Sequence, residues 1–439
     1  MMNYKNNIIL LFLISFTASF AQELLTKENA IGIALENNYG IKIADNNLKI
    51  SENNKGILNS GYLPTLSGVA GSTFNRDNTD AIFSNGDITT LKNAKSSRYN
   101  ASVSLNYTLF DGLGRLYNYK QLKEQYNLSE LQARETIEKT ILQLFSVYFK
   151  VAQLTEDVAL LNQSLKISKD RLIRAKYQSD YGQSTKLAVL NAEVDVNNDS
   201  IALLNSIQLL ANAKRDLYVV LGKNEDPDFY VDTQVTFVVT KNKQELFEQV
   251  KANNITLLQI EKDIKISDFQ LKASKSGYLP TIGLTSTYGW TKSNNNSASF
   301  LTESTNTGLS TGFNLKWDLF NGGKTSTQVQ NAKINYETRQ FFKQQSELQI
   351  TRDFNNTWED YKTKLFILQT QEKNVETNKR NFSRTEEQFK LGQITSIEFR
   401  QAQVNLLNAQ SNLNQATFDA KNAELALLQL TGELLNTAF

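Results

Sequence analysis

The chain contains two copies of one unit, and this duplication limits its fold more than any other feature. The segment 60–65 (SGYLPT) recurs at 276–281, and 109–112 (LFDG) returns as 319–322 (LFNG). The offset is about 216 residues for the first pair and about 210 for the second, so the second copy is slightly shorter. We therefore expect two equivalent halves, with boundaries at 22–222 for the first repeat, 223–242 for a linker and 243–439 for the second repeat.

The first residues have the pattern of an export signal. Lys5 precedes an apolar stretch at 8–16, and small residues before Gln22 predict cleavage at that point. The apolar stretch is shorter than the ~20 residues that a membrane-spanning helix needs. We interpret 1–21 as a signal peptide, so the mature chain is expected to be exported.

Each copy contains two strand-like segments. Apolar and polar residues alternate along 62–74, 102–109, 278–290 and 309–319, which predicts strands with one apolar and one polar face. Strands of about this length cross a bilayer when tilted. A soluble hairpin with one buried face is the alternative interpretation. The polar stretches between the strands of each pair are expected to be exposed loops, at 75–98 and 291–306.

Aromatic side chains near the ends of these segments are candidates for the membrane interface. Amphipathic rings favour the level of the lipid headgroups, and membrane barrels carry aromatic girdles there. The five candidates for contact with outer-membrane lipid are Tyr62, Tyr107, Tyr278, Trp290 and Trp317.

The remaining residues are predicted to be helical. Apolar residues recur at heptad spacing from Ile137 to Leu172, and again from Phe354 to Phe389. Sustained heptads indicate helices that wind around one another along a continuous apolar seam. We interpret these side chains as core.

The positions of the glycines predict the helix lengths. Between Gly112 and Gly182 there is room for one helix of roughly 70 residues, or ~105 Å. Shorter helices at 26–59 and 184–221 are expected to stack end to end beside it, and the second copy to repeat this pattern. The linker contains a β-rich run, 235–239, which is expected to pack beside the junction of the short helices.

The number of strands in each chain predicts that several chains assemble into an oligomer. Single-chain membrane barrels need at least eight strands, and an open sheet edge in lipid would leave costly unpaired backbone groups. Several chains must therefore share one barrel. The expected fold is an α/β membrane assembly, in which a transmembrane β-barrel with four strands from each chain continues into a long α-helical coiled-coil barrel in the periplasm.

This ordered set of features resembles the TolC family of outer-membrane efflux proteins. The resemblance covers the whole mature chain. It rests on the signal peptide, the duplication, the strand starts at Gly61 and Gly277, the strand ends at Asp111 and Asn321, and the helix turns at 181–184 (YGQS) and 391–395 (LGQIT).

The resemblance implies a function and a set of partners. The chain would form a homotrimer with a twelve-stranded barrel in the outer membrane and a large periplasmic extension. It would be the passive channel of a tripartite efflux or type I secretion system and would conduct drugs, metals or proteins. It would dock on a periplasmic adaptor (membrane fusion) protein and, through it, on an inner-membrane RND or ABC pump, with no cofactor.

The turns between the long helices are the expected docking site for the adaptor. Gly182 and Gly392 permit a tight reversal of the chain, and the small polar residues beside them expose backbone and hydroxyl groups. Turn chemistry with no partner is the alternative. The candidate docking residues are Tyr181, Gly182, Gln183, Ser184, Leu391, Gly392, Gln393 and Thr395.

The same resemblance points to a periplasmic gate. Relatives often close this end with a ring of acidic side chains on the returning helix of the second copy. Glu398 occupies one such position, but Gln401 stands where a second acidic residue is expected, and Ala188 is the equivalent in the first copy. Fewer carboxylates repel one another less and attract cations less, so we expect a weaker or differently selective constriction. A solvated surface charge is the alternative for Glu398.

Composition excludes several other classes of protein. The chain has no Cys and no His, so zinc-thiolate sites, iron–sulfur clusters, disulfides, an N-terminal lipid anchor and the commonest general base are all missing. The net charge of +2 gives no reason to expect nucleic acid. An outer-membrane hydrolase therefore has no visible site. A trimeric coiled-coil adhesin or a structural envelope protein is the remaining alternative, although internal, duplicated strand pairs argue against it.

Overall fold

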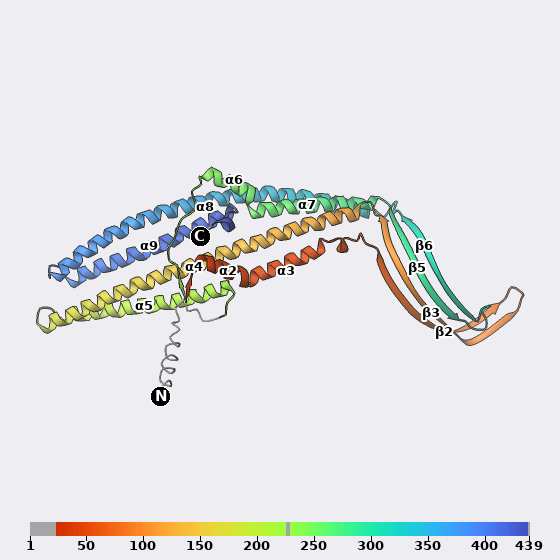
Figure 1. Ribbon diagram of the computed structural model, residues 1–439, viewed down its shortest axis with the longest axis horizontal. Coiled ribbons are helices and arrows are strands. Elements are labelled where there is room, and N and C mark those ends of the chain that lie inside the picture. Colours follow the sequence, from red (N-terminus) through yellow and green to blue (C-terminus); the bar gives the residue numbers. More distant parts are fainter. Residues whose placement is uncertain (1–22, 225–228, 438–439) are drawn as a thin grey trace, which may run out of the picture. The chain divides into compact units, whose positions relative to one another are not determined.

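The computed structural model describes residues 23–224 and 229–437, so the expected signal peptide lies outside the described residues. The chain divides into two compact units. A helical unit contains the chain up to residue 45, then 133–255 and the part from 347 onward. A second unit, with the large sheet, contains 46–132 and 256–346. Each unit draws on both sequence repeats (Figure 1).

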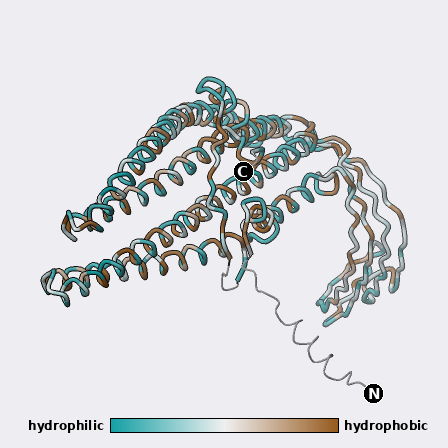
Figure 2. Tube along the Cα trace, turned by 60° about the vertical axis from the view of Figure 1, so that its left-hand side comes forward, coloured by the Kyte–Doolittle hydropathy of each residue, from teal (hydrophilic) through white to brown (hydrophobic). Residues whose placement is uncertain are grey.

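Four long helices confirm the heptad prediction. Helices α4 (Gly114–Asp180) and α8 (Lys324–Lys390) have 67 residues each, or about 100 Å at 1.5 Å per residue. The returning helices are α5 (Lys186–Leu221) and α9 (Ser396–Leu430). Hydrophilic residues run along all four (Figure 2). Among the described helices, none is both long and apolar enough to span a membrane.

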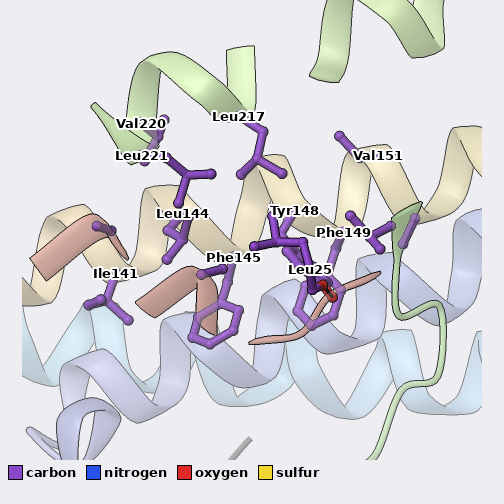
Figure 3. Close-up of a cluster of buried hydrophobic side chains, with 14 of the residues drawn as sticks. Leu25, Ile141, Leu144, Phe145, Tyr148, Phe149, Val151, Leu217, Val220 and Leu221 are labelled. Carbon is purple, nitrogen blue, oxygen red and sulfur yellow. Dashed lines mark hydrogen bonds between the residues drawn. The ribbon is translucent and has the colours of Figure 1, made fainter. Parts of the chain in front are cut away.

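The main core lies in the helical unit, where α4 and α5 pack together (Figure 3). Leu144, Tyr148 and Val151 of α4 are fully buried, and Leu217 and Leu221 of α5 pack into the same cluster. In the second copy the heptad residues Phe354, Tyr361 and Leu368 of α8 are also buried. Half of the predicted heptad residues are therefore buried core, and the other half, such as Val158 and Val375, are only partly buried in the single chain.

A buried tyrosine joins this core to a small two-stranded sheet. Strand β1 (Glu23–Leu25) pairs in parallel with β4 (Phe229–Val231). The Tyr148 hydroxyl donates to the Leu25 carbonyl at 2.7 Å and accepts from the Asp232 N–H at 2.9 Å. Burial raises the pKa of Tyr148 to about 12, so the hydroxyl keeps the proton that it donates.

The single opening helix expected at 26–59 is wrong, because it is broken at Asn38 into α2 (Lys27–Asn37) and α3 (Tyr39–Asn54). Asn38 has an extended backbone, and its amide donates to the Val220 carbonyl at 2.8 Å. The side chain thus satisfies a carbonyl at the end of α5 that the helix itself leaves unpaired.

The second copy repeats this joint. Asn254 separates α6 (Lys243–Asn253) from α7 (Ile255–Lys275) and donates to the Leu430 carbonyl of α9 at 3.0 Å. Gly222 and Gly432 follow α5 and α9 in the left-handed region, with φ of +71° and +70°. The short helices do meet end to end, as expected, and each meeting point is an asparagine against a glycine-capped helix end.

The linker between the copies packs against α9. Glu424 accepts the backbone N–H groups of Val238 and Val239 at 2.6 and 2.7 Å. Lys421 donates to the Thr236 carbonyl at 2.7 Å and to Glu424 at 2.6 Å. Both charged side chains are buried, and their pairing offsets the desolvation that each suffers. The run 235–239 therefore packs at the helices as expected, although it forms no strand.

The second unit contains a four-stranded antiparallel sheet in the order β2-β3-β5-β6. The strands are β2 (Thr65–Ile82), β3 (Ile88–Phe110), β5 (Thr281–Asn294) and β6 (Glu303–Lys316). They come as two hairpins, one from each copy (Figure 1). Strands β2 and β6 are the edges of this sheet in the single chain.

The register separates an apolar face from a polar face. Leu105 and Val103 of β3 lie opposite Leu66 and Gly68 of β2, and Val103 also faces Tyr288 of β5. The next residue along, Ser104, lies between Ser67 and Thr287 and bonds the Thr287 hydroxyl at 2.9 Å. Large apolar side chains on the first face are exposed, including Leu66, Tyr288, Leu309, Phe313 and Leu315.

The loop expected at 75–98 is mostly strand, and the loop expected at 291–306 is shorter than predicted, because only 295–302 lie between β5 and β6. Strands β2 and β3 continue to Ile82 and from Ile88, so their turn contains only the residues between. The strand predicted at 309–319 also ends earlier than expected, because β6 stops at Lys316. Backbone pairing stabilises these polar segments although both of their faces are exposed.

The repeated LF(D/N)G motif makes the change from strand to helix. The Asp111 carboxylate accepts from the Arg115 backbone N–H at 2.8 Å and from its guanidinium at 3.2 Å. In the second copy the Asn321 side-chain carbonyl accepts from the Thr325 N–H at 3.3 Å. Both residues cap the first turn of a 67-residue helix.

Candidate functional site

Two tight turns lie at the same end of the helical unit (Figure 1). In the first, Gly182 has a φ of +70° and the Gln183 N–H donates to the Gln178 carbonyl at 2.7 Å. In the second, Gly392 has a φ of +74° and the Gln393 N–H donates to the Gln388 carbonyl at 2.9 Å. The left-handed glycine closes each helix, as predicted.

The returning helices begin differently in the two copies. Thr185 caps α5 with one hydrogen bond, from the Ala188 N–H at 3.3 Å. Thr395 caps α9 as part of a capping box, in which the Glu398 carboxylate accepts from the Thr395 N–H and hydroxyl, both at 2.8 Å. Two more bonds therefore fix the start of α9 than the start of α5.

The gate candidates are both exposed on α9. Backbone and hydroxyl hydrogen bonds from Thr395 hold the pKa of Glu398 below its usual value, so this carboxylate is charged at neutral pH. The Gln401 amide donates to Asn405 at 2.8 Å on the same helix. Both side chains form hydrogen bonds only with residues of α9 and its N-cap among the described residues. Their role at a gate stays a prediction.

A groove of about 620 Å³ lies between the two hairpin tips of the chain. Apolar side chains line it from both copies, among them Leu187 and Ile397. Four predicted docking residues also line it: Gln183, Ser184, Gly392 and Thr395.

The other docking candidates lie elsewhere on the tips. Tyr181 is largely exposed and lines a neighbouring hollow of about 410 Å³ on α4. Leu391 is also largely exposed, while Gly182, Leu391 and Gln393 line neither hollow. The structure thus brings about half of the predicted tip residues into one groove.

Sequence reasoning missed a network of ion pairs beside this groove. Arg400 of α9 forms a two-pronged pair with Asp199 of α5, at 2.8 and 2.6 Å. Arg171 of α4 pairs with Asp195 of α5, and the Asp195 carboxylate also lies 3.6 Å from Arg400. The Ser168 hydroxyl donates to Asp199 at 2.6 Å.

This network joins the two hairpins of the chain. Arg171 is almost fully buried, and burial lowers its pKa although Asp195 opposes that shift. Gln403 of α9 donates to the Ser164 and Ser168 hydroxyls of α4, at 3.0 and 3.1 Å. Closer to the tips, Arg174 donates to the Lys390 carbonyl at 2.8 Å. Side chains from both copies therefore hold the tip region together.

The aromatic candidates divide between the two ends of the strands. Tyr62 and Tyr278 precede β2 and β5, Trp317 follows β6, and the Trp317 indole donates to the Tyr278 carbonyl at 3.1 Å. Tyr107 lies inside β3 near the same end. Trp290 lies near the far end of β5. Their contact with lipid stays a prediction.

Comparisons with known proteins agree with this architecture. The model of the family described as outer membrane efflux protein matches residues 30–223 and 246–433. The outer membrane efflux protein BepC of Brucella suis is 23% identical over 421 residues, which is 93% of this chain and 86% of the relative. The outer membrane protein TolC of Vibrio cholerae is 22% identical over 311 residues, 70% of each chain.

Solved structures show the same fold. The Campylobacter jejuni CmeC outer membrane channel superposes with a TM-score of 0.77 at 16% identity, covering 93% of this chain and 86% of that one. The open state of the Neisseria gonorrhoeae MtrE outer membrane channel gives 0.72 at 16% identity, covering 93% and 89%.

The duplicated strand pairs and helical hairpins therefore define an outer-membrane channel and not an enzyme. The chain belongs to the outer membrane efflux protein family, because the family model matches both repeats over most of their length. The resemblance noted from the sequence is confirmed, as is the location in the outer membrane.

Proposed function

We propose that this chain is the outer-membrane channel of a tripartite efflux or type I secretion system. It conducts drugs, metals or proteins passively from a periplasmic adaptor and an inner-membrane pump to the outside. The observation that carries the proposal is the four-stranded sheet, with an exposed apolar face and two long unpaired edges. Such a sheet is stable in lipid only when other copies close it into a barrel.

Exposed apolar residues on α5 support an assembly of several copies. Leu187, Val194 and Ile201 follow heptad spacing and are each more than half exposed in the single chain. A heptad seam of this kind is the contact surface of a coiled coil. Helices of neighbouring copies would cover it, and three copies would make a barrel of twelve strands.

The hairpin tips are the proposed contact with the adaptor. The groove between them combines apolar side chains with exposed hydroxyl and amide groups. Residues from both sequence repeats of the one chain line it. An adaptor hairpin would pack its apolar face into this groove. The pump would then reach the channel only through the adaptor.

A test of this function compares export in a deletion strain that carries different forms of the chain. The double variant Tyr181→Glu/Leu391→Glu places charge on two exposed apolar side chains at the tips. We expect it to assemble normally and to be as sensitive to toxic compounds as the deletion strain. The matched control is Phe300→Glu, an exposed side chain in the turn between β5 and β6, which should restore export.

Two results would contradict the proposal. Wild-type export of drugs, metals and proteins in the deletion strain, with no related gene in the genome, would remove the export function. Full export by the tip variant would be consistent with a channel function, but it would show that the tips are not the docking site.

Replacing Glu398 by glutamine tests the gate. Glutamine is also accepted in a capping box, so the start of α9 should be kept while one negative charge per chain is removed. We expect weaker block by divalent cations and lower cation selectivity in single-channel recordings. Because the pKa of Glu398 is below its usual value, the wild-type selectivity should persist from neutral pH down to about pH 5. Recordings identical to wild type would leave Glu398 with a capping role only.

A further inference from the structure

Two cationic side chains face each other on one surface of the sheet. Arg76 of β2 and Lys95 of β3 are direct register partners, so they point to the same face. Directly opposed residues have Cβ atoms about 5 Å apart, and like charges in this arrangement destabilise a sheet. An anion bound between the two side chains would remove that repulsion.

These cations lie on the apolar face of the sheet, just beyond its aromatic end. The preceding pair on that face is Phe74 and Ser97, and the Phe74 ring contacts the Tyr99 ring edge-on at 5.8 Å. Strands rise about 3.3 Å per residue, so Arg76 is about 7 Å beyond Phe74 along β2. In the proposed barrel the apolar face meets lipid, and this position is the level of the headgroups.

The surroundings leave this pair uncompensated. Among the described residues, neither Arg76 nor Lys95 forms an ion pair, whereas the neighbouring Lys292 pairs with Glu303 at 2.7 Å. The adjacent Asp77 and Arg98 belong to the opposite face. Asp80 lies about 13 Å further along β2, beyond the register shift between Asp77 and Thr79.

A shallow hollow of about 440 Å³ adjoins the two cations. Phe74, Arg76 and Lys95 all line it. Ser97 and Asn294 also line it, with the Asn294 amide donating to the Ser97 hydroxyl oxygen at 3.4 Å, and the remaining lining is polar: Asn75, Ser96 and Asn295. Because the Ser97 oxygen acts as an acceptor in this bond, its hydroxyl hydrogen can still be donated to a bound ligand. The hollow offers hydrogen-bond donors and positive charge beside an apolar surface.

We propose that Arg76 and Lys95 bind the phosphate of a phosphorylated lipid in the outer leaflet. The guanidinium of Arg76 suits two oxygens of one phosphate, Lys95 adds a point charge, and the acyl chains continue over Phe74 and Tyr99. The inference rests on the proposed function, because it requires the apolar face of the sheet to face lipid. It adds a lipid site to the channel that is distinct from the hairpin tips.

The test measures lipid binding to the purified assembly by native mass spectrometry. The probes are lipid A with its phosphates and the same lipid after enzymatic dephosphorylation. We expect wild type to prefer the phosphorylated form, and Arg76→Gln/Lys95→Gln to bind it at least about tenfold more weakly, given ~1 kcal/mol for each cation near a lipid headgroup. The variant Arg76→Lys/Lys95→Arg keeps both charges and should bind nearly as wild type does.

The matched control is Arg98→Gln/Lys316→Gln, which removes two exposed cations from the same sheet outside the site. It should bind as wild type does. Equal binding of both lipids by wild type, an equal loss in the control, or displacement of the lipid by millimolar inorganic phosphate alone would overturn the proposal. Oligomer mass is recorded in the same spectra. Intact oligomers without lipid preference would overturn only the lipid site, whereas monomers throughout would contradict the proposed function.

Discussion

Replacing Arg400 by alanine is expected to destabilise the helical unit by about 3–5 kcal/mol, the usual effect of breaking a buried ion pair. The change leaves the buried Asp199 carboxylate with only the Ser168 hydroxyl as a partner. For a unit of this size, such a loss lowers the midpoint of thermal unfolding by roughly 6–20 °C. Circular dichroism at 222 nm on the purified protein measures it, and cleavage at the tips by a dilute protease gives a second readout.

Two control variants separate the ion pair from a general loss of charge. Arg384→Ala removes an exposed arginine from α8 and should change stability by less than about 0.5 kcal/mol. Arg400→Met/Asp199→Leu replaces both charges by apolar side chains of similar size and should recover most of the loss. If Arg400→Ala unfolds at the wild-type temperature, the pair does not hold the hairpins together.

The second large effect is expected for Gly222→Ala. An added Cβ would lie 2.5 Å from the Asn37 carbonyl oxygen, and the backbone is left-handed at this residue. The conformation alone costs about 1–2 kcal/mol for alanine, and the forced shift of backbone adds about 1–3 kcal/mol. Gly432→Ala should behave in the same way, because its Cβ would lie 2.6 Å from the Asn253 carbonyl oxygen.

Gly182→Ala is the matched control for these two variants. Its φ of +70° is nearly that of Gly222, but no atom lies within 4 Å of the added Cβ. Only the conformational term applies, so Gly222→Ala should lower stability by about 1–3 kcal/mol more than Gly182→Ala. Thermal unfolding measures the difference. Equal losses for the two variants would mean that the close approach at the joint contributes nothing.

The long helices and their turns could be predicted because local signals determine them. Heptad spacing is repeated over many turns, and Gly182 and Gly392 mark where each helix reverses. The break at Asn38 could not be predicted in this way. Asparagine is tolerated inside helices, and here its conformation depends on the Val220 carbonyl, which is remote in the sequence.

The tip region was predictable only in part for the same reason. Arg171 and Arg400 each look like ordinary surface charges, and only the packed hairpins bring them to Asp195 and Asp199. The capping box was readable from Thr395 and Glu398, a threonine followed at the third position by a glutamate.

The long β2–β3 hairpin was hidden by its composition. Residues 75–98 are mostly polar because both faces of the hairpin are exposed, so they lack the apolar alternation by which strands are recognised. The direct pairing of Arg76 with Lys95 is likewise a property of the register, which the sequence alone leaves open.

The two asparagine joints have a mechanical consequence. Helix α4 is continuous through hydrogen bonds along its own backbone, whereas α5 and α3 are connected across Asn38 by side-chain contacts. A twisting load along α4 is therefore resisted by the backbone of one continuous helix. The same load along α5 and α3 is resisted by the non-covalent contact at Asn38. We therefore expect a small rotation at Asn38 to need the loss of this one contact and of no helical turn, and the same holds for Asn254 in the second copy.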